Sequence, residues 1–344
     1  MIAEERQALR AAVADACAGP DSPGWNLKAW KALDQMGVTS LSVAEAAGGG
    51  GADLSAAVVV LTALGSLGVS VPVTETGLMA GWLMERAGAR LPEGIITAAV
   101  GGALELHPGE GHWLVSGTLP RVPWARHADR AVVLSRFESA SYAVVVPLSL
   151  ARLDHGTNVA GEPRDDVVLR SAAVPAAAVH RLEDPEPAVD LLRRGAFGRA
   201  ALMAGAAQGV YAYAARYAGE RHQFGRPLSA MQAVQQLLAE LAAEASAMTV
   251  AVEAAAAAVD RDPARSWTLD AARIRVAEAA GTVAAAGHQV LGAIGFTDEH
   301  PLHHLTTRLW AWREEYGNSR VWSDQLGSDL AREDRSSLWQ QITG

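Results

Sequence analysis

Arg221 and Phe224 are the residues whose types and spacing most directly suggest binding chemistry. They lie in the segment YAGERHQFGRPL, residues 217–228, where a helical pattern ends just before Gly225 and Pro227. The Gly-x-Pro step is expected to end one helix and start the next, because proline suits a first helical turn. On an exposed corner of this kind a guanidinium can pair with a phosphate, and an aromatic side chain can cover a ring. The plainer interpretation is a helix cap with a surface arginine.

A second segment, QVLGAIGFT at residues 289–297, also ends a helical pattern. Its two glycines, Gly292 and Gly295, allow the backbone to approach a ligand closely. The side-chain amide of Gln289 can be offered to an adenine or a ribose. The alternative interpretation is an ordinary turn between two helices.

In this order and at this separation, the two segments resemble the C-terminal domain of the acyl-CoA dehydrogenase family. The resemblance extends from about Gly205 to Gly327, and residues 33–53, LDQMGVTSLSVAEAAGGGGAD, are similar to the family's opening helices and glycine loop. It implies an α+β fold of three domains. These are an N-terminal helical domain at residues 1–90, a middle β-barrel or β-sandwich domain at 91–185, and a C-terminal four-helix bundle with FAD-binding and oligomerisation segments at 186–344.

The resemblance also implies FAD as a cofactor, bound at a subunit interface. Positions matching the arginine and the phenylalanine of the first segment meet the diphosphate and adenine end of FAD from the neighbouring subunit. The glutamine–glycine turn of the second segment contributes to the same site. The candidate cofactor-binding residues are therefore Arg221, Phe224, Gln289, Gly292, Ala293 and Asn318.

In this family a hydride passes from the β-carbon of an acyl thioester to the flavin while a glutamate removes the α-proton, so the two groups must sandwich the acyl chain. In many members the glutamate directly precedes a glycine beyond the second segment, where this chain has Tyr316 followed by Gly317. Glu315 is adjacent, but one residue along a helix turns a side chain by about 100°. Other members carry the glutamate near the start of the first bundle helix, where residues 191–200, LLRRGAFGRA, contain no acid. The catalytic residue is therefore left open.

Tyr316 also has a structural interpretation. It is expected to continue an apolar helical stripe formed by Leu302, Leu305, Leu309 and Trp312, which places it in the core. A phenol is in addition a poor base for an α-proton at neutral pH, because it is normally protonated there.

The expected β-domain departs from the family as well. The segment ITAAVGGALEL, residues 96–106, does not match the Thr-Glu-Pro loop that contacts flavin and substrate in the family. The segment RVPWARHADRAVV, residues 121–133, fits the second flavin-facing segment only loosely, with Trp124 as an unusually bulky residue.

The missing base and the short chain resemble the non-catalytic subunits of heterotetrameric acyl-CoA dehydrogenases that actinobacteria use on steroid side-chain thioesters. This resemblance implies FAD-dependent desaturation of an acyl-CoA or other acyl thioester, with a paralogous subunit that supplies the glutamate. It also implies an electron-transfer flavoprotein or a similar electron acceptor. Two alternatives stay open: a homo-oligomeric flavoenzyme with modified chemistry, and a structural partner subunit that binds no flavin.

Composition restricts the class of protein. The chain has 344 residues, half of them apolar, which allows a large core in roughly two or three packed units. Its formal net charge of −9 argues against nucleic acid or an anionic membrane as a partner. Cys17 is the only cysteine, which excludes an internal disulfide and fits a reducing cytoplasm. The uncharged stretch from Leu54 to Thr74 contains glycine and proline, so a buried helix followed by a loop is expected.

Three patterns succeed one another along the chain. The pattern is helical up to about Arg90, and short β-like runs follow between about Pro92 and Arg181, as in a small antiparallel barrel or sandwich. From Pro187 onward the pattern is helical again. One of these helices carries a predicted packing seam at Met231, Val234, Leu238, Leu241, Ala245, Met248 and Val252.

The remaining polar groups are expected to be structural. Residues 48–51, GGGG, read as a loop before a helix capped by Asp53, since no GxGxxG or GK[ST] pattern marks a phosphate cradle. Glu240 and Glu244 stand at i,i+4 and are expected on a solvated helical face. No metal site is expected at the helix start that carries His300, His303 and His304, because no thiol or clear third ligand accompanies them.

Overall fold

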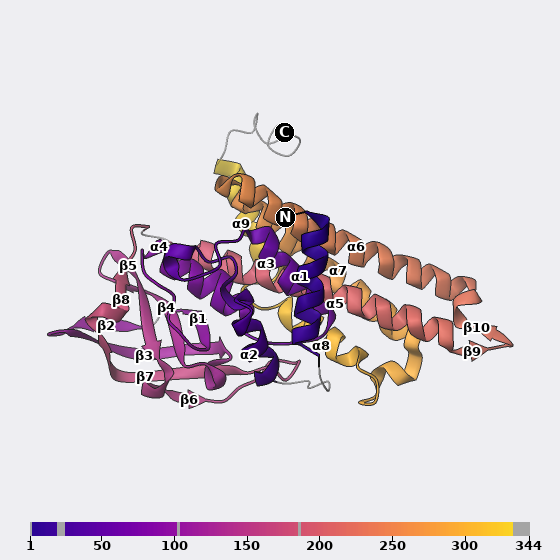
Figure 1. Cartoon of the computed structure of the whole chain (residues 1–344), viewed down its shortest axis with the longest axis horizontal. Coiled ribbons are helices and arrows are strands. Elements are labelled where there is room, and N and C mark those ends of the chain that lie inside the picture. The colour runs from indigo at the N-terminus through magenta and orange to yellow at the C-terminus, as the bar shows by residue number, and fades with distance from the viewer. Residues whose placement is uncertain (1, 19–24, 102–103, 185–186, 333–344) are drawn as a thin grey trace. The chain divides into compact units, whose positions relative to one another are not determined.

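The computed structural model describes residues 2–18, 25–101, 104–184 and 187–332. The chain runs through a set of helices, two β-sheets and a second set of helices (Figure 1), so the α+β fold expected from the sequence is confirmed. The helices are α1 (Ala3–Ala16), α2 (Leu27–Gln35), α3 (Leu54–Ser66), the π-helix η3 (Thr74–Gly81), α4 (Trp82–Arg86), α5 (Ala188–Glu220), α6 (Gln232–Arg261), α7 (Trp267–Leu291), α8 (Leu302–Trp312) and α9 (Ser319–Arg332). The strands are β1 (Ile96–Val100), β2 (Glu105–Pro108), β3 (His112–Pro123), β4 (Arg130–Phe137), β5 (Ala140–Pro147), β6 (Arg152–Asp154), β7 (Arg164–Pro175), β8 (Val179–Arg181), β9 (His222–Gln223) and β10 (Arg226–Pro227).

The chain divides into two compact units. Unit 1 consists of Met1–Leu61 and Val69–Gly195, and unit 2 of Thr62–Gly68 and Ala196–Gly344. Unit 1 combines the N-terminal helices with both four-stranded sheets, and unit 2 contains most of the C-terminal helices together with the end of α3. Residue 90, at which we expect the first domain boundary, lies between α4 and β1, and residue 185, at which we expect the second, lies outside the described residues.

The glycine loop before α3 closes on its own backbone. The N–H groups of residues 48–51 all donate to carbonyl oxygens within residues 40–45. A Cβ at Gly49 would lie 2.3 Å from the carbonyl oxygen of Val43, so close packing requires glycine there. Asp53 then caps α3 as predicted, since its Oδ1 accepts a hydrogen bond of 2.7 Å from the backbone three residues later. The loop is therefore structural, because its N–H groups are not available to a phosphate.

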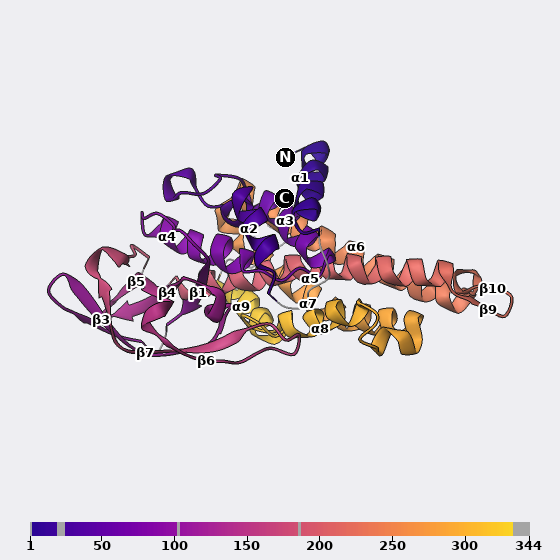
Figure 2. The ribbon, with the colours of Figure 1, turned by 60° about the horizontal axis from the view of Figure 1, so that its bottom comes forward.

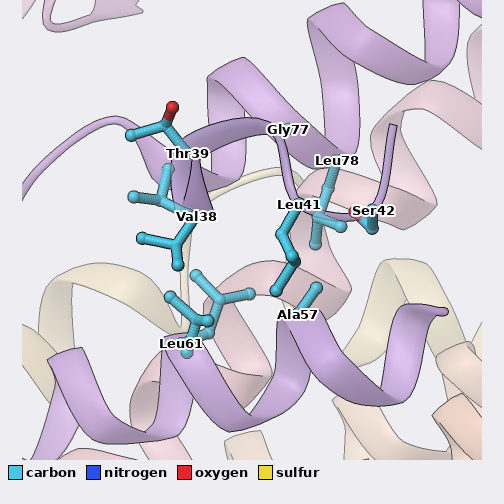
Figure 3. A pocket seen from close by; sticks show the side chains of 10 residues that line it. Val38, Thr39, Leu41, Ser42, Ala57, Leu61, Gly77 and Leu78 are labelled. Atoms are coloured by element: carbon cyan, nitrogen blue, oxygen red, sulfur yellow. The ribbon is translucent and has the colours of Figure 1, made fainter. Parts of the chain in front are cut away.

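A small cavity lies within the helical part of unit 1 (Figure 3). It offers about 10 Å³, which is at most the space for a single water molecule. The cavity is too small for a cofactor or an acyl chain. Its lining, mostly apolar, comes from the turn after α2, from α3 and from the region of η3: Val38, Thr39, Leu41, Ser42, Ala57, Val60, Leu61, Val73, Gly77 and Leu78.

Two four-stranded sheets form the β part of unit 1, in the strand orders β1-β4-β5-β8 and β2-β3-β7-β6. The short β-like runs ITAAV, HWLVSG, AVVLS, YAVVV and DVVLR of the sequence lie in β1, β3, β4, β5 and β7, in that order. The expectation of antiparallel pairing needs one correction among the described pairs, because β1 pairs with β4 in parallel. One apolar core takes fully buried residues from both sheets: Val115, Val133, Val144 and Val167.

In unit 2, α6 and α7 run side by side, and the β9–β10 hairpin lies at the far end of α6 (Figure 2). The predicted seam on α6 is buried from Leu241 to Val252, whereas Met231, Val234 and Leu238 are only half-buried. α6 is the one described helix that is long and apolar enough to cross a membrane, a criterion that the core helix of a bundle also meets. Its buried seam is accounted for by packing within the bundle.

The prediction of a solvated acidic face on α6 is correct only for Glu240, which is exposed. Glu244 instead forms an ion pair with Arg275 of α7, and both side chains stay partly exposed. This pair joins α6 to α7.

Glycine also brings the end of α3 close to α5 within unit 2. A Cβ at Gly65 would lie 2.0 Å from the carbonyl oxygen of Leu202, and one at Gly205 would lie 2.0 Å from that of Thr62. Any side chain at either position would separate the two helices. This contact fixes the course of α5, which carries Arg199 and ends next to Arg221.

Candidate cofactor site

The first predicted binding segment forms a β-hairpin between α5 and α6. α5 ends immediately before Arg221, as predicted, but Pro227 does not begin the next helix. It pairs with His222 in the β9–β10 hairpin, and α6 begins only at Gln232. The reason is the turn itself, because Phe224 and Gly225 adopt φ values of 53° and 79°, and two successive positive φ angles are the signature of a tight hairpin.

This hairpin presents its two candidate binding side chains to solvent. Phe224 is 91% exposed, and Arg221 is exposed as well. No ion pair of Arg221 is found within the described part of the chain. The guanidinium and the ring are therefore available to a ligand or to another protein chain.

The second predicted segment lines a cavity of about 620 Å³ at the C-terminal end of α7. This volume lies within the range typical of small-molecule sites. Gln289, Gly292 and Ala293 are all exposed on its wall, and Gly292 ends α7 with a φ of 64°. The structure thus brings three of the predicted residues together, but Arg221, Phe224 and Asn318 do not line this cavity.

Three aromatic side chains of the cavity were not foreseen from the sequence: His288, Phe296 and Trp310. The space between these aromatic side chains is made by small residues on one face of α7, namely Gly281, Ala284 and Ala285. They lie on the same helical face as His288 and Gln289, so helical spacing counted back from Gln289 could have identified this face from the sequence. The cavity therefore has a helical floor of small residues and aromatic walls.

His288 is anchored to α8 through one ring nitrogen. Its Nε2 shares a hydrogen bond of 2.9 Å with the hydroxyl of Thr306. The other ring nitrogen, Nδ1, is buried with no hydrogen-bond partner among the described residues. The ring stacks on Phe296 with centroids 4.2 Å apart and an interplanar angle of 19°.

The turn after α8 carries the two candidates for the catalytic position. α8 ends at Trp312, and Tyr316 adopts a φ of 56° in a non-helical turn where it is half-buried. The prediction that Tyr316 continues the apolar stripe of the helix is therefore wrong. The argument that a helical step of 100° separates it from Glu315 fails for the same reason.

One buried guanidinium explains why the helix ends there. Arg273 Nη2 lies 2.6–3.2 Å from the carbonyl oxygens of residues 312, 313, 315 and 317. These acceptors include carbonyls that a helix end leaves unsatisfied. Burial lowers the pKa of Arg273 to about 10, so it still carries its charge at neutral pH.

A second buried arginine forms an ion pair with the carboxylate of Glu315, the candidate base. Arg199 Nε donates to Glu315 Oε2 at 2.7 Å, and the two side chains are only 2% and 12% exposed. The guanidinium also lies 5.3 Å from the centroid of the Tyr316 ring. The position expected for a base thus contains a closed ion pair beside an aromatic ring.

Comparison with known proteins identifies the family. The family models for the N-terminal and C-terminal domains of acyl-CoA dehydrogenases match residues 2–90 and 188–329. The chain belongs to the acyl-CoA dehydrogenase family. It is 28% identical over 316 residues to the acyl-CoA dehydrogenase IpdE2 of Mycobacterium tuberculosis. The matched region covers 87% of this chain and 89% of that protein.

Solved structures of acyl-CoA dehydrogenases share the fold. The ChsE4–ChsE5 complex from Mycobacterium tuberculosis contains a chain that is 23% identical, with a TM-score of 0.85 over 97% of this chain and 99% of that one. A glutaryl-CoA dehydrogenase from Mycobacterium smegmatis in complex with FADH2 is 18% identical, with a TM-score of 0.87 over 96% of both chains.

Two further residues, one predicted from the resemblance and one that departs from it, have local structural roles. Asn318 caps α9, since its Oδ1 accepts from the backbone N–H of Val321 at 3.2 Å. Trp124 is 1% exposed and adopts a φ of 60°, and its ring lies 5.7 Å from that of Trp25. Trp25 in turn stacks on His127 at 4.8 Å, so the loosely matching acyl-CoA dehydrogenase segment is covered by aromatic side chains of unit 1 itself.

The histidines around α8 lie as the sequence suggested, at its start. His300 Nδ1 accepts from Leu302 N at 3.1 Å, and the His303 and His304 rings contact each other with centroids 3.9 Å apart. Within the described ranges, no group of three or more histidine, cysteine or acidic side chains could hold a metal ion.

We expect the stability of unit 2 to fall as the pH drops below about 6.5. Burial, together with the charge of a protonated His303, lowers the pKa of His288, and burial, Arg216 and His303 lower that of His300. Folding therefore favours the neutral imidazoles, so stability is complete above the unfolded pKa and is lost below it. Denaturant midpoints measured at neutral and at mildly acidic pH check this, and His288→Gln should weaken the dependence. A midpoint that rises on acidification would contradict it.

Proposed function

We propose that this chain is the base-lacking subunit of a heteromeric, FAD-dependent acyl-CoA dehydrogenase. The reaction is the α,β-desaturation of an acyl thioester, and a paralogous subunit supplies the glutamate. The observation that carries the proposal is the Arg199–Glu315 ion pair next to Tyr316, in the turn where the family's base is expected.

The residues of unit 2 fit the diphosphate and adenine end of FAD. Arg221 is an exposed guanidinium on the same hairpin as the exposed ring of Phe224, a combination that suits a diphosphate followed by a nucleobase. The cavity at the end of α7 is roomy, and a Cβ at Gly292 would meet no atom within 4 Å, so its backbone is open to a ligand. That the hairpin and the cavity are separate within one chain supports a site completed by a second chain.

Each group of this chain then has a defined role. When bound, FAD would provide the acceptor for the hydride that leaves the β-carbon. Arg221 neutralises the diphosphate, Gln289 orients the nucleotide through its amide, and Gly292 allows close approach of the backbone. The α-proton goes to the glutamate of the paralogous subunit, and the electron pair left on the α-carbon forms the new double bond.

Neither Glu315 nor Tyr316 is suited to take that proton. A general base must reach the α-hydrogen directly or through one water. The Glu315 carboxylate is engaged by Arg199, and both side chains are largely withdrawn from solvent. Tyr316 has the same guanidinium against its ring, which disfavours any movement of that ring toward a substrate.

The substrate and partners follow from the resemblance to base-lacking subunits. We propose a CoA ester of a steroid side chain as substrate and an electron-transfer flavoprotein, or a similar protein, as electron acceptor. A homo-oligomeric flavoenzyme is the second candidate, because this chain itself carries all the candidate cofactor-binding residues. A flavin-free helper is the third, favoured by the aromatic cover over residues 124–127 in unit 1.

Purification through a tag on the full-length chain tests these possibilities. Produced alone, the chain should retain little flavin and should not oxidise acyl-CoA esters. Isolated from its natural source, it should bring down an acyl-CoA dehydrogenase paralogue, and the complex should show a flavin spectrum and activity. An active, yellow homo-oligomer would favour the second candidate, and an active complex in which this chain contacts no flavin would favour the third.

A further inference from the structure

We propose that Phe296, supported from behind by His288, is the platform on which the adenine ring of the bound dinucleotide stacks. The inference rests on the proposed binding of FAD and assigns positioning roles to two residues outside the predicted set. It is drawn from the stacked pair, from the exposure of Phe296 and from the bonding of His288 to α8.

Phe296 has one covered face and one open side. Its ring lies 4.2 Å from the ring of His288 and nearly parallel to it, yet the side chain is 72% exposed. Both residues line the cavity that also holds Gln289. An aromatic side chain that is fixed on one face and open on the other accepts a further planar ring by stacking.

His288 fixes the platform in place. It belongs to α7, and its Nε2 is anchored to Thr306 of α8 at 2.9 Å. Phe296 lies in the short segment between these helices, and Gly295 permits the close packing there, since a Cβ would come within 3.2 Å of His288 Nδ1. The orientation of the Phe296 ring therefore depends on the imidazole and on its hydrogen bond.

Trp310 is a less suitable platform on the same cavity. It is 41% exposed, but the guanidinium of Arg313 lies 4.2 Å from its ring centroid and covers one face. The far edge of its ring lies next to Gly281, where a Cβ would come within 3.8 Å. Trp310 therefore closes the cavity from the side.

Adenine is the ring that fits this platform, because the neighbouring hydrogen-bonding groups suit a purine nucleotide. Gln289 presents an amide, which can both donate to and accept from the edge of a base. A ring stacked on Phe296 would have this amide next to it on the cavity wall. The proposed ligand part is thus adenosine, which FAD and ADP share and FMN lacks.

Fluorescence titration of the tagged native complex, stripped of flavin, tests the assignment with FAD, ADP and FMN. Phe296→Ala should weaken FAD and ADP binding to a similar extent, by about tenfold, as expected for loss of one stacking contact. FMN binding should not change. Phe296→Trp should restore the affinity, and Val250→Ala, an exposed apolar truncation on α6, should have no effect.

His288 and Thr306 are tested in the same titrations. Thr306→Val and His288→Phe each remove the hydrogen bond that holds the ring behind Phe296, and each should weaken FAD and ADP binding severalfold. FMN binding should not change in either variant. A structural defect elsewhere would lower the affinity for all three ligands.

Three outcomes would overturn the assignment. FAD and ADP affinities that survive Phe296→Ala would do so, as would their loss in Trp310→Leu with Phe296→Ala unaffected. Dissociation of the complex by Phe296→Ala at unchanged ADP affinity would assign the ring to a protein interface. A wild-type complex that binds neither FAD nor ADP would instead refute the proposed function, and this inference with it.

Discussion

Replacing Arg199 with methionine is expected to lower the free energy of unfolding by about 3–5 kcal/mol, the range for breaking a buried ion pair from one side. The substitution leaves the Glu315 carboxylate, only 12% exposed, without its guanidinium. It also removes the cation next to the Tyr316 ring. Chemical denaturation of the purified chain measures the loss.

The structure supplies a matched control in the same unit. Arg275 pairs with Glu244, but these side chains are 40% and 26% exposed. Arg275→Met should therefore cost at most about 1 kcal/mol. The double variant Arg199→Met, Glu315→Gln should recover part of the loss, because no unpaired charge remains buried. A loss in Arg199→Met no larger than that in Arg275→Met would show that the buried pair is not stabilising.

Glu315→Gln alone separates structure from catalysis. If Glu315 serves only as the partner of Arg199, turnover of the folded complex should decrease by less than about tenfold, whereas removal of a general acid or base costs about 10²–10⁴-fold. Circular dichroism at the assay temperature confirms that the variant is folded. A collapse of activity in the folded variant would make Glu315 the base and would favour the homo-oligomeric alternative.

Replacing Arg221 with glutamine is expected to weaken FAD binding by about 10–100-fold, the loss that corresponds to a hydrogen bond with a charged group. The guanidinium is exposed on the β9–β10 hairpin, so the change should leave stability nearly unaltered. Arg221→Lys should keep part of the affinity, because an ammonium neutralises charge but lacks the bidentate fork.

Arg226→Gln is the control for Arg221→Gln. Arg226 is exposed on the same hairpin, and its replacement removes the same charge. It lies on the strand opposite the predicted phosphate-binding position. FAD titrations of the complex at low and at moderate salt compare the two variants. Equal losses would indicate a general charge effect, and no loss in Arg221→Gln would contradict the proposed role of the hairpin.

The sequence correctly predicted features that depend on neighbours along the chain. Local periodicity accounts for the order of helices and strands. Glycine and capping chemistry account for the Asp53 cap, for the end of α5 just before Arg221 and for the Gly292 turn. The hairpin after Arg221 was missed because a Gly-x-Pro step also occurs between helices. Only the backbone angles of Phe224 and Gly225 distinguish the two.

The chemistry at the expected catalytic position was decided by the tertiary structure. The sequence places Glu315 beside Tyr316, but the partner of Glu315 is Arg199, 116 residues away on α5, and the turn is shaped by Arg273 on α7. The stacking of His288 on Phe296 likewise depends on how α7 returns toward α8. Local patterns specify which groups are present and where helices end. Which charge neutralises which, and which ring stays open to a ligand, depends on distances between segments that periodicity does not encode.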